Sequence, residues 1–350
     1  MARIIAVANQ KGGVGKTTTA VNLAASLAIA ERRTLLVDAD PQSNATSGIG
    51  LQKDAVRLSL YDAMIDGRAA RDAIVRHEAL PLLDVLPATQ DLVGAELELV
   101  ERHGRETALR RVLETVESAY DFILVDCPPS LGLLTLNVLT AAHGVLIPIQ
   151  CEYYALEGIS QLLNTVRLVQ QNFNPILAIE GVLLTMYDAR LNLCRQVAAD
   201  AKEYFGAKVF RTPVPRNVRL AEAPSFGKPI LLYDVQSVGA QSYLAIAQEL
   251  LQRVEAARAS EGPPPEAASP GVPPAEAPTD AEARGGAEPR PDTEAGTTEA
   301  RAEADALVDP EAQPGEAGHR LDDDGAPRGS QPAATVSDPE TAAGVPEGAQ

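Results

Sequence analysis

A glycine-rich segment near the start of the chain is the feature that most restricts its possible folds. The segment reads QKGGVGKTT over residues 10–18 and lies between the apolar run Ile4–Ala8 and a stretch of helical period that begins at Lys16. Glycines let backbone N–H groups turn inward around anionic oxygens, and the start of a helix presents its positive dipole end to them. The order of strand, glycine-rich loop, Lys-Thr-Thr and helix therefore predicts a phosphate-binding loop in an α/β fold.

The loop departs from the plain form of this motif, GxxxxGK[ST], because Gln10 stands at its first position. The chemistry is preserved, since Lys16 would reach the β and γ phosphates of a nucleotide and the Thr17 hydroxyl would be a ligand of Mg²⁺. The alternative, a glycine-rich turn with two solvated lysines, does not account for the order of the surrounding elements. The loop residues expected to bind the nucleotide are Lys11, Gly12, Gly13, Val14, Gly15, Lys16, Thr17 and Thr18.

Short apolar runs alternate with stretches of helical period through most of the chain. The expected strands are Ile4–Ala8, Thr34–Asp38, Leu82–Leu86, Phe122–Asp126, Gly144–Ile149, Ala178–Thr185 and the shorter run Lys208–Phe210. The expected helices are Lys16–Ala30, Glu106–Val116, Leu131–Ala142, Ala155–Asn172, Asn192–Phe205 and Ala240–Arg258. Continuous apolar runs indicate strands buried on both faces. The alternation therefore predicts a doubly wound, mostly parallel sheet that binds ligands at the carboxyl ends of its strands.

The last quarter of the chain differs in composition from the rest. Residues 259–350 contain 20 acidic residues against five arginines and no lysine, so they carry −15 of the formal net charge of −18. They also hold 15 of the 26 prolines and no aromatic residue, which leaves little apolar surface to offset the chain entropy lost on folding. We expect one folded domain over residues 1–258 and a disordered acidic tail over residues 259–350. The near-neutral domain can still carry a local basic face.

Cysteine usage and hydropathy indicate the compartment. Cys127, Cys151 and Cys194 are far apart and odd in number, which fits a reducing cytosol. The first apolar run is interrupted at residues 9–11 before a signal-peptide core could form, and no later run approaches the roughly 18 residues of a membrane span. We expect a cytoplasmic protein without a membrane anchor.

Acidic residues end two of the expected strands. Phe122–Asp126 is an apolar strand that ends in Asp126, a Walker B pattern in which this carboxylate would hold Mg²⁺ through water. Another strand ends in Asp38, and Asp40 follows two residues later. An acid at a strand end can instead be a turn or helix-cap residue, but the neighbouring phosphate-binding loop favours a role in the nucleotide site.

Lys11 distinguishes this loop from other phosphate-binding loops. It is poorly placed for the γ-phosphate of its own nucleotide but could cross a face-to-face dimer to reach the partner's. The segment 11–17 resembles the KGGxGK[ST] signature of the deviant Walker A family, which includes the ParA and MinD ATPases and the nitrogenase iron protein. The resemblance implies a homodimer that sandwiches ATP, with Lys11 and Lys16 acting on the nucleotide, Asp40 positioning the attacking water and Asp38 near the Mg²⁺ shell.

Cys127 could suggest the iron–sulfur ligand of the nitrogenase iron protein. No second cysteine stands at a supporting spacing, so we expect a small buried core thiol instead.

Within this family the chain most resembles the chromosomal, Soj-like ParA proteins, over nearly all of residues 1–258. The resemblance rests on residues 8–19 (ANQKGGVGKTTT), 38–46 (DADPQSNAT), 126–131 (DCPPSL) and 215–229 (PRNVRLAEAPSFGKP). MinD proteins end in an amphipathic membrane-targeting helix, whereas an anionic bilayer would repel this acidic tail, so we expect no membrane partner. Larger plasmid ParA proteins carry an N-terminal helix-turn-helix domain, whereas here the first strand starts at residue 3 or 4.

The resemblance implies non-specific binding of double-stranded DNA by the ATP dimer, which requires basic side chains aligned on one face. It favours Arg190 and Arg219, although a single surface arginine is more often only a solvated charge. The other basic candidates are Arg195, Lys202, Lys208, Arg211 and Arg216. Pro215 and Asn217 lie where relatives line the adenine pocket. A ParB-like, centromere-binding partner would then stimulate hydrolysis on the nucleoid during chromosome or plasmid segregation.

Two other functions are compatible with the same fold. A ParA/MinD-like ATPase could position a protein or membrane cargo without DNA, and salt-sensitive DNA binding would separate the two. A dethiobiotin-synthetase-like ligase would need a substrate pocket, and Lys11 argues against it. We interpret the tail as a solubilising extension, with competition against DNA for the basic face as the alternative.

Overall fold

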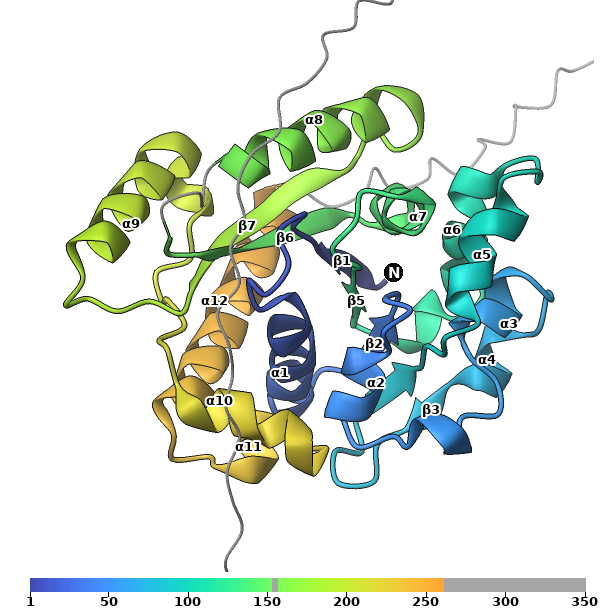
Figure 1. Ribbon diagram of the computed structural model, residues 1–350, viewed down its shortest axis with the longest axis horizontal. Helices are drawn as coiled ribbons and strands as arrows, with labels where there is room; N and C mark the ends of the chain where they lie inside the picture. The colour runs from blue at the N-terminus through green and yellow to red at the C-terminus, as the bar shows by residue number, and fades with distance from the viewer. Residues whose placement is uncertain (153–156, 261–350) are drawn as a thin grey trace, which may run out of the picture. The chain divides into compact units, whose positions relative to one another are not determined.

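The computed structural model describes residues 1–152 and 157–260, which form a sheet with helices on both of its faces (Figure 1). The strands are β1 (Arg3–Val7), β2 (Thr34–Asp38), β3 (Val75–Arg76), β4 (Leu83–Leu86), β5 (Phe122–Asp126), β6 (Gly144–Gln150) and β7 (Ala178–Thr185). The α-helices are α1 (Lys16–Ile29), α2 (Asn44–Gly48), α3 (Leu60–Met64), α4 (Ala70–Ala73), α5 (Leu92–Leu99), α6 (Ala108–Glu114), α7 (Leu133–Ala141), α8 (Glu157–Asn172), α9 (Asn192–Phe205), α10 (Val218–Glu222), α11 (Ile230–Tyr233) and α12 (Val238–Ser260).

The strand order is β3-β4-β2-β5-β1-β6-β7, and every neighbouring pair is parallel except β3 with β4. This confirms the predicted doubly wound, mostly parallel sheet. From β1 the chain continues to β2 on one side of β1. Later it crosses from β5 over β1 to β6 on the other side. In such sheets the carboxyl ends beside the reversal form the ligand crevice. The glycine-rich loop, Asp38 and Asp126 all follow strands at this edge.

Two apolar layers cover the sheet, and β1 shows how the sequence supplies both of them. Ile5 and Val7 belong to the core that contains α1 and α12, whereas Ile4 and Ala6 belong to the core that contains α6, α7 and α8. Helices α1 and α12 also pack against each other, and they lie together in the middle of Figure 1. The alternation along β1 therefore holds the glycine-rich loop between two packed layers.

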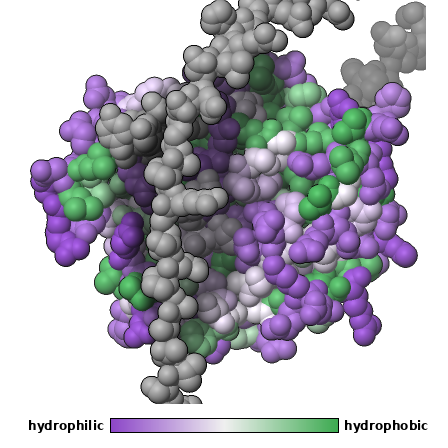
Figure 2. Space-filling model, viewed as in Figure 1, coloured by the Kyte–Doolittle hydropathy of each residue, from purple (hydrophilic) through white to green (hydrophobic). Residues whose placement is uncertain are grey.

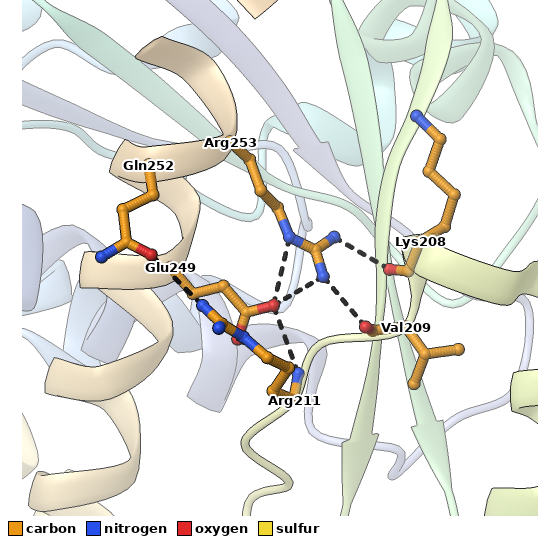
Figure 3. Close-up of polar contacts among 6 residues, drawn as sticks. All are labelled: Lys208, Val209, Arg211, Glu249, Gln252 and Arg253. Carbon is orange, nitrogen blue, oxygen red and sulfur yellow. Dashed lines mark hydrogen bonds and ion pairs between the residues drawn. The ribbon is translucent and has the colours of Figure 1, made fainter. Parts of the chain in front are cut away.

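The predicted strand at Lys208–Phe210 is wrong. This segment makes only an isolated bridge between Val209 and Val182 of β7. Figure 3 shows why: Arg253 of α12 donates to the carbonyl oxygens of Lys208 and Val209, at 3.0 and 2.9 Å, and Glu249 of α12 accepts from the N–H of Arg211. Side chains of α12 thus satisfy two carbonyls of this segment, while the Val182 carbonyl of β7 accepts from the N–H of Phe210 (2.9 Å). The seventh strand is instead the two-residue β3, at the opposite edge of the sheet.

Several helices differ at their ends from the predicted bounds. Helix α12 continues to Ser260, two residues beyond its predicted end at Arg258. The helix predicted over Glu106–Val116 begins with a 3₁₀ turn and is α-helical only over α6. Residues 155–156, the predicted start of α8, and the tail beyond Ser260 lie outside the described residues. Across the described part of the chain, no helix is both long enough and apolar enough to cross a membrane.

Candidate nucleotide-binding site

The glycine-rich loop takes the curved path that its glycines predict. Gly13 and Gly15 have φ angles of +75° and +88°, a region that strains other residues, and Gly15 directly precedes α1. The loop is tied to neighbouring strands, because the Thr185 hydroxyl donates to the Val14 carbonyl (2.8 Å) and the Asn9 amide donates to the Pro148 carbonyl (2.7 Å). The loop is therefore held at both ends by the ends of β6 and β7.

The two lysines of the loop occupy different environments. Lys16 is 7% exposed, and its Nζ atom donates to the Lys11 carbonyl at 3.1 Å, inside the curve of the loop. Burial lowers the pKa of the Lys16 ammonium, and the charge of Asp126 offsets part of this change. The Lys11 side chain instead leaves the loop and forms a 2.9 Å ion pair with Glu152, with about one third of its surface exposed (34%). Lys16 thus points inward and Lys11 outward.

The acids at the ends of β2 and β5 lie side by side. Asp38 and Asp126 are register partners on neighbouring strands and both are fully buried. Asp38 accepts hydrogen bonds from the N–H and hydroxyl of Thr46, at 2.8 and 2.7 Å, and from the N–H of Asp40. Burial still raises the pKa of Asp38 to about 6. Asp38 is therefore a fixed group whose oxygens already have protein partners.

Asp126 is the less satisfied of the two carboxylates. Within the described residues neither of its oxygens has a hydrogen-bond partner, although the Thr17 hydroxyl lies near enough to act on its pKa in the lowering direction. Burial and the neighbouring Asp38 nevertheless raise the pKa of Asp126 well above its usual range. A buried, unpartnered carboxylate beside a lysine is costly unless another cation completes the site. These oxygens fit a bound divalent cation.

The donor set suits Mg²⁺ bound together with phosphates rather than a closed protein cage. The described residues contain no group of three or more His, Cys, Asp or Glu side chains arranged to hold a metal. Magnesium usually keeps several waters and takes one or two protein oxygens plus phosphate oxygens. Thr17 at the start of α1, Asp126 at the end of β5 and Asp38 beside it provide that pattern. Asp40 is also buried and accepts from the N–H of Gln42 at 2.9 Å.

A second part of the site is an apolar cavity of about 230 Å³ beside the loop. Gly15 and Thr18 line it from the loop side, and Pro215 and Asn217 line it from the segment before α10. Tyr243 of α12 closes its base, with its hydroxyl 3.1 Å from that of Thr19. The structure therefore brings the two residues predicted near the adenine ring into one cavity with the glycine-rich loop.

The two arginines predicted to bind DNA are exposed but paired with acids. Arg190 makes a two-pronged contact with Asp188, at 2.9 and 2.7 Å, which lowers the pKa of that carboxyl to about 2. Arg219 of α10 lies 3.0 Å from Glu222 and 3.5 Å from Asp234. The side chains of Arg190 and Arg219 remain 89% and 55% exposed. Such surface pairs are worth at most about 1 kcal/mol, so both arginines stay available to another anion.

One loop connects these arginines with the cavity. Tyr187 donates its N–H to the Val214 carbonyl (3.0 Å), and its carbonyl accepts from the Arg216 N–H (3.3 Å). These bonds join the loop that follows β7, which contains Arg190, to the segment that lines the cavity. Asn217, at the end of that segment, caps α10 by accepting from the N–H of Arg219 at 2.8 Å. A change in the cavity can therefore reach both arginines through backbone contacts.

Comparison with known proteins agrees with this geometry. The chain matches the model of a family described as an AAA domain over residues 2–179. It is 60% identical over 250 residues to the sporulation initiation inhibitor protein Soj of Bacillus subtilis (strain 168), covering 71% of this chain and 98% of that protein. It is 58% identical over 251 residues to the chromosome partitioning protein ParA of Myxococcus xanthus (strain DK1622), covering 72% of this chain and 88% of that protein. The chain belongs to the ParA/Soj family of P-loop ATPases.

Solved structures confirm the fold of this ParA/Soj family member. A structure described as cobyrinic acid a,c-diamide synthase from Mycobacterium smegmatis, with a bound ATP analogue and magnesium, is 40% identical with a TM-score of 0.65. The match covers 74% of this chain and 98% of the synthase chain. The cell division ATPase MinD of Pyrococcus furiosus is 25% identical with a TM-score of 0.60, covering 72% of this chain and 99% of that one. The resemblance inferred from the deviant Walker A signature is thereby confirmed.

Several residues of this site were not anticipated from the sequence. Glu152, which pairs with Lys11, and Thr185, which holds Val14, are 141 and 171 residues away from their partners. Their only sequence signal is position, since Thr185 ends a predicted strand and Glu152 follows another by three residues. Thr46, which donates to Asp38, lies inside the 38–46 stretch, but nothing in its residue type indicates that contact.

Proposed function

We propose that this protein is an ATP-dependent dimerising switch that binds DNA without sequence preference and hydrolyses ATP when a ParB-like partner stimulates it. The observation that carries the proposal is the opposite orientation of two lysines in one loop. Lys16 lies inside the loop, where the phosphates of its own nucleotide would bind, while Lys11 leaves the loop and pairs with Glu152 at its surface. A face-to-face partner would present its nucleotide phosphates to Lys11.

The proposed chemistry assigns one role to each residue of the site. Lys16 and the backbone N–H groups of residues 12–18 bind the β and γ phosphates, and Pro215 and Asn217 contact the adenine. Thr17 and Asp126 would hold Mg²⁺, with Asp38 near its shell, and the ion would supply positive charge beside the phosphates.

Hydrolysis needs two further residues, and each has a position that suits its role. Asp40 orients the attacking water. Its carboxylate accepts from the N–H of Gln42, and its own N–H donates to Asp38, which fixes it beside the buried acids. Lys11 stabilises charge on the partner's γ-phosphate. The Lys11–Glu152 pair is partly exposed and worth at most about 1 kcal/mol, so it can exchange for a phosphate when the dimer closes.

The proposed DNA surface consists of Arg190 and Arg219. Their link through residues 214–217 to the cavity provides a route by which nucleotide state alters the spacing of the arginines. A dimer doubles the number of phosphate contacts, so the affinity for DNA depends on ATP and falls steeply with salt. In the cell the ATP form would lie on the nucleoid.

DNA binding tests this proposal. The affinity for a non-specific duplex is measured by fluorescence anisotropy with ATP and with ADP, at two salt concentrations. We expect tight binding only with ATP, weakening at higher salt, and an affinity lower by about three- to tenfold in Arg219→Ala. Arg167→Ala, an exposed arginine on α8, is the matched control and keeps the wild-type affinity. Equal binding with ATP and ADP would contradict the switch, and no binding in any state would favour positioning of a protein or membrane cargo.

A metabolic function has one observation in its favour, the name of the Mycobacterium smegmatis structure, a diamide synthase. An amide-forming enzyme would turn over ATP without DNA and without dimer closure. Several relatives at 51–58% identity carry partitioning names, including Soj of Thermus thermophilus and ParA of Caulobacter vibrioides. We therefore rank the partitioning switch first.

A further inference from the structure

Helix α5 has an apolar face that no described part of the chain covers. Its inner side chains, Leu92, Ala95 and Leu99, are buried in the core. Val93, Leu97 and Val100, which follow one another by four and three residues along one helix face, are 57%, 75% and 54% exposed. Figure 2 shows hydrophobic residues among the polar ones on the side where Figure 1 places α5 and α6. We call Val93, Leu97 and Val100 the α5 stripe.

The α5 stripe lies in an acidic setting. Residues 91–101 contain four acids, Asp91, Glu96, Glu98 and Glu101, and no basic residue. The next basic side chains along the chain, Arg102 and Arg105, donate to the backbone carbonyls of Ile65 and Val100. Arg102 also lies 3.9 Å from Glu98, so residues 91–105 carry four acids against two arginines. A partner that covers the stripe therefore meets a net negative charge, which favours a segment with apolar residues on one face and Lys or Arg beside them.

The inner side of α5 contacts the segment that follows Asp126. Glu96 accepts a hydrogen bond from the N–H of Leu134, at the positive end of α7 (3.4 Å). The same carboxylate approaches Gly132 so closely that a Cβ there would overlap its oxygen. Only residues 127–131 separate Gly132 from Asp126. A displacement of α5 therefore reaches the end of β5 through Glu96.

We propose that the α5 stripe is the docking surface for a basic amphipathic segment of the stimulating partner, and that Glu96 transmits docking to the Asp126 segment. The inference rests on the proposed function, because it supplies the surface for its stimulation step. Three side chains on an eight-residue helix are far fewer than the roughly 20–30 residues that each side of a stable protein interface typically contributes. A short segment fits this surface better than a second copy of the whole domain.

The test compares partner-stimulated ATP turnover and partner binding in four proteins. The probe is the full-length ParB-like protein of the same organism, titrated in the presence of ATP and non-specific DNA. Leu97→Lys removes the most exposed apolar side chain and adds a repelling charge, while Glu101→Lys changes only the charge beside the stripe. Leu168→Lys on α8, which is 59% exposed, is the matched control, and wild type is the fourth protein.

We expect Leu97→Lys to raise the partner concentration for half-maximal stimulation at least about tenfold, since a central apolar contact carries much of such an interface. Glu101→Lys should raise it about threefold, with a smaller effect at high salt. Leu168→Lys should match wild type, and all four proteins should share the same turnover without partner.

Each remaining outcome counts against a different statement. If wild type and Leu97→Lys are stimulated and bound equally, the docking surface is wrong while the proposed function stands. If wild type is neither stimulated nor bound, the proposed function loses its partner step and the inference fails with it. If Leu97→Lys instead loses ATP-dependent dimerisation in sedimentation, a second copy covers the stripe and the proposal is overturned.

Discussion

The nucleotide site and the paired surface arginines are both charged regions, yet the protein surrounds them in opposite ways. Lys16, Asp38 and Asp126 are buried at the carboxyl ends of strands, where removing charge from water is costly and each group depends on its neighbours. Arg190 and Arg219 are mostly exposed, and each pairs with an acid that lies within three residues of it. The first region is therefore assembled by folding, whereas the second is solvated and already complete at the surface.

The largest expected effect comes from the buried lysine. Lys16→Ala should lower ATP turnover at least about 100-fold, because it removes the charge placed to act on the β and γ phosphates. Nucleotide affinity, measured with a fluorescent ATP analogue, should fall as well. Lys11→Ala is the matched comparison in the same loop, and it should keep nucleotide affinity close to wild type. Equal loss of affinity in both variants would show that the two lysines do not differ as their orientations indicate.

The buried carboxylates predict an unusual dependence of stability on pH. Burial raises the folded-state pKa of Asp38 to about 6, above the roughly 3.9 of an unfolded aspartate, so the folded state binds more protons between these values. Without nucleotide and magnesium, the free energy of unfolding should fall as pH rises from about 4 to about 6, by about 2–3 kcal/mol from this group alone. Chemical denaturation at several pH values measures it.

An asparagine variant of Asp126 tests the same buried charges at neutral pH. Asp126→Asn should raise the stability of the nucleotide-free protein at about pH 7 to 8, since it removes a buried, unpartnered charge whose pKa is raised by burial and by Asp38. It should also lower magnesium-dependent turnover by about 100-fold. A lower stability in Asp126→Asn at neutral pH would mean that Asp126 is well solvated or paired.

The surface arginines should show a smaller effect that depends on salt. Arg219→Ala should lower the affinity of the ATP form for DNA by about three- to tenfold and reduce the slope of log affinity against log salt by about one for each phosphate that is no longer bound. Nucleotide affinity should not change, because Arg219 does not line the cavity. A salt-independent loss of DNA binding would point to a misplaced α10 rather than to a missing arginine–phosphate pair.

The acidic tail should have the smallest effect on either region. A protein ending at Ser260, where α12 ends, should keep ATP turnover and DNA affinity within about twofold of the full chain, as expected of a solubilising extension. Anisotropy at low salt measures the DNA affinity. A clear rise in affinity upon truncation would instead show that the tail competes with DNA for the arginines.

Sequence patterns predicted the parts of the molecule whose signals are local. Strands β2, β5 and β7 have their predicted bounds because continuous apolar runs are needed where both faces are buried. The glycine-rich loop was equally readable, since its conformation depends on its own glycines. Strand β3 was missed because two exposed residues carry no periodic signal, and α2 to α4 are too short to show one.

Contacts between distant residues could not be predicted. The segment 208–210 has a strand-like composition, but Arg253 of α12 takes the carbonyls of Lys208 and Val209, and only a bridge to β7 remains. The pairing of Lys11 with Glu152 likewise depends on how β6 is placed next to β1. The sequence identified which lysine was unusual, and only the fold shows that its side chain points away from the loop interior.

The central claim is that Lys11 acts across an ATP-dependent dimer, and sedimentation velocity tests it most directly. Wild type and Lys11→Ala are compared with ATP and with ADP, at protein concentrations where both are saturated with nucleotide. The account predicts a wild-type dimer with ATP and a monomer with ADP, and a Lys11→Ala protein that binds ATP but stays monomeric. A Lys11→Ala protein that dimerises as wild type does with ATP would contradict it.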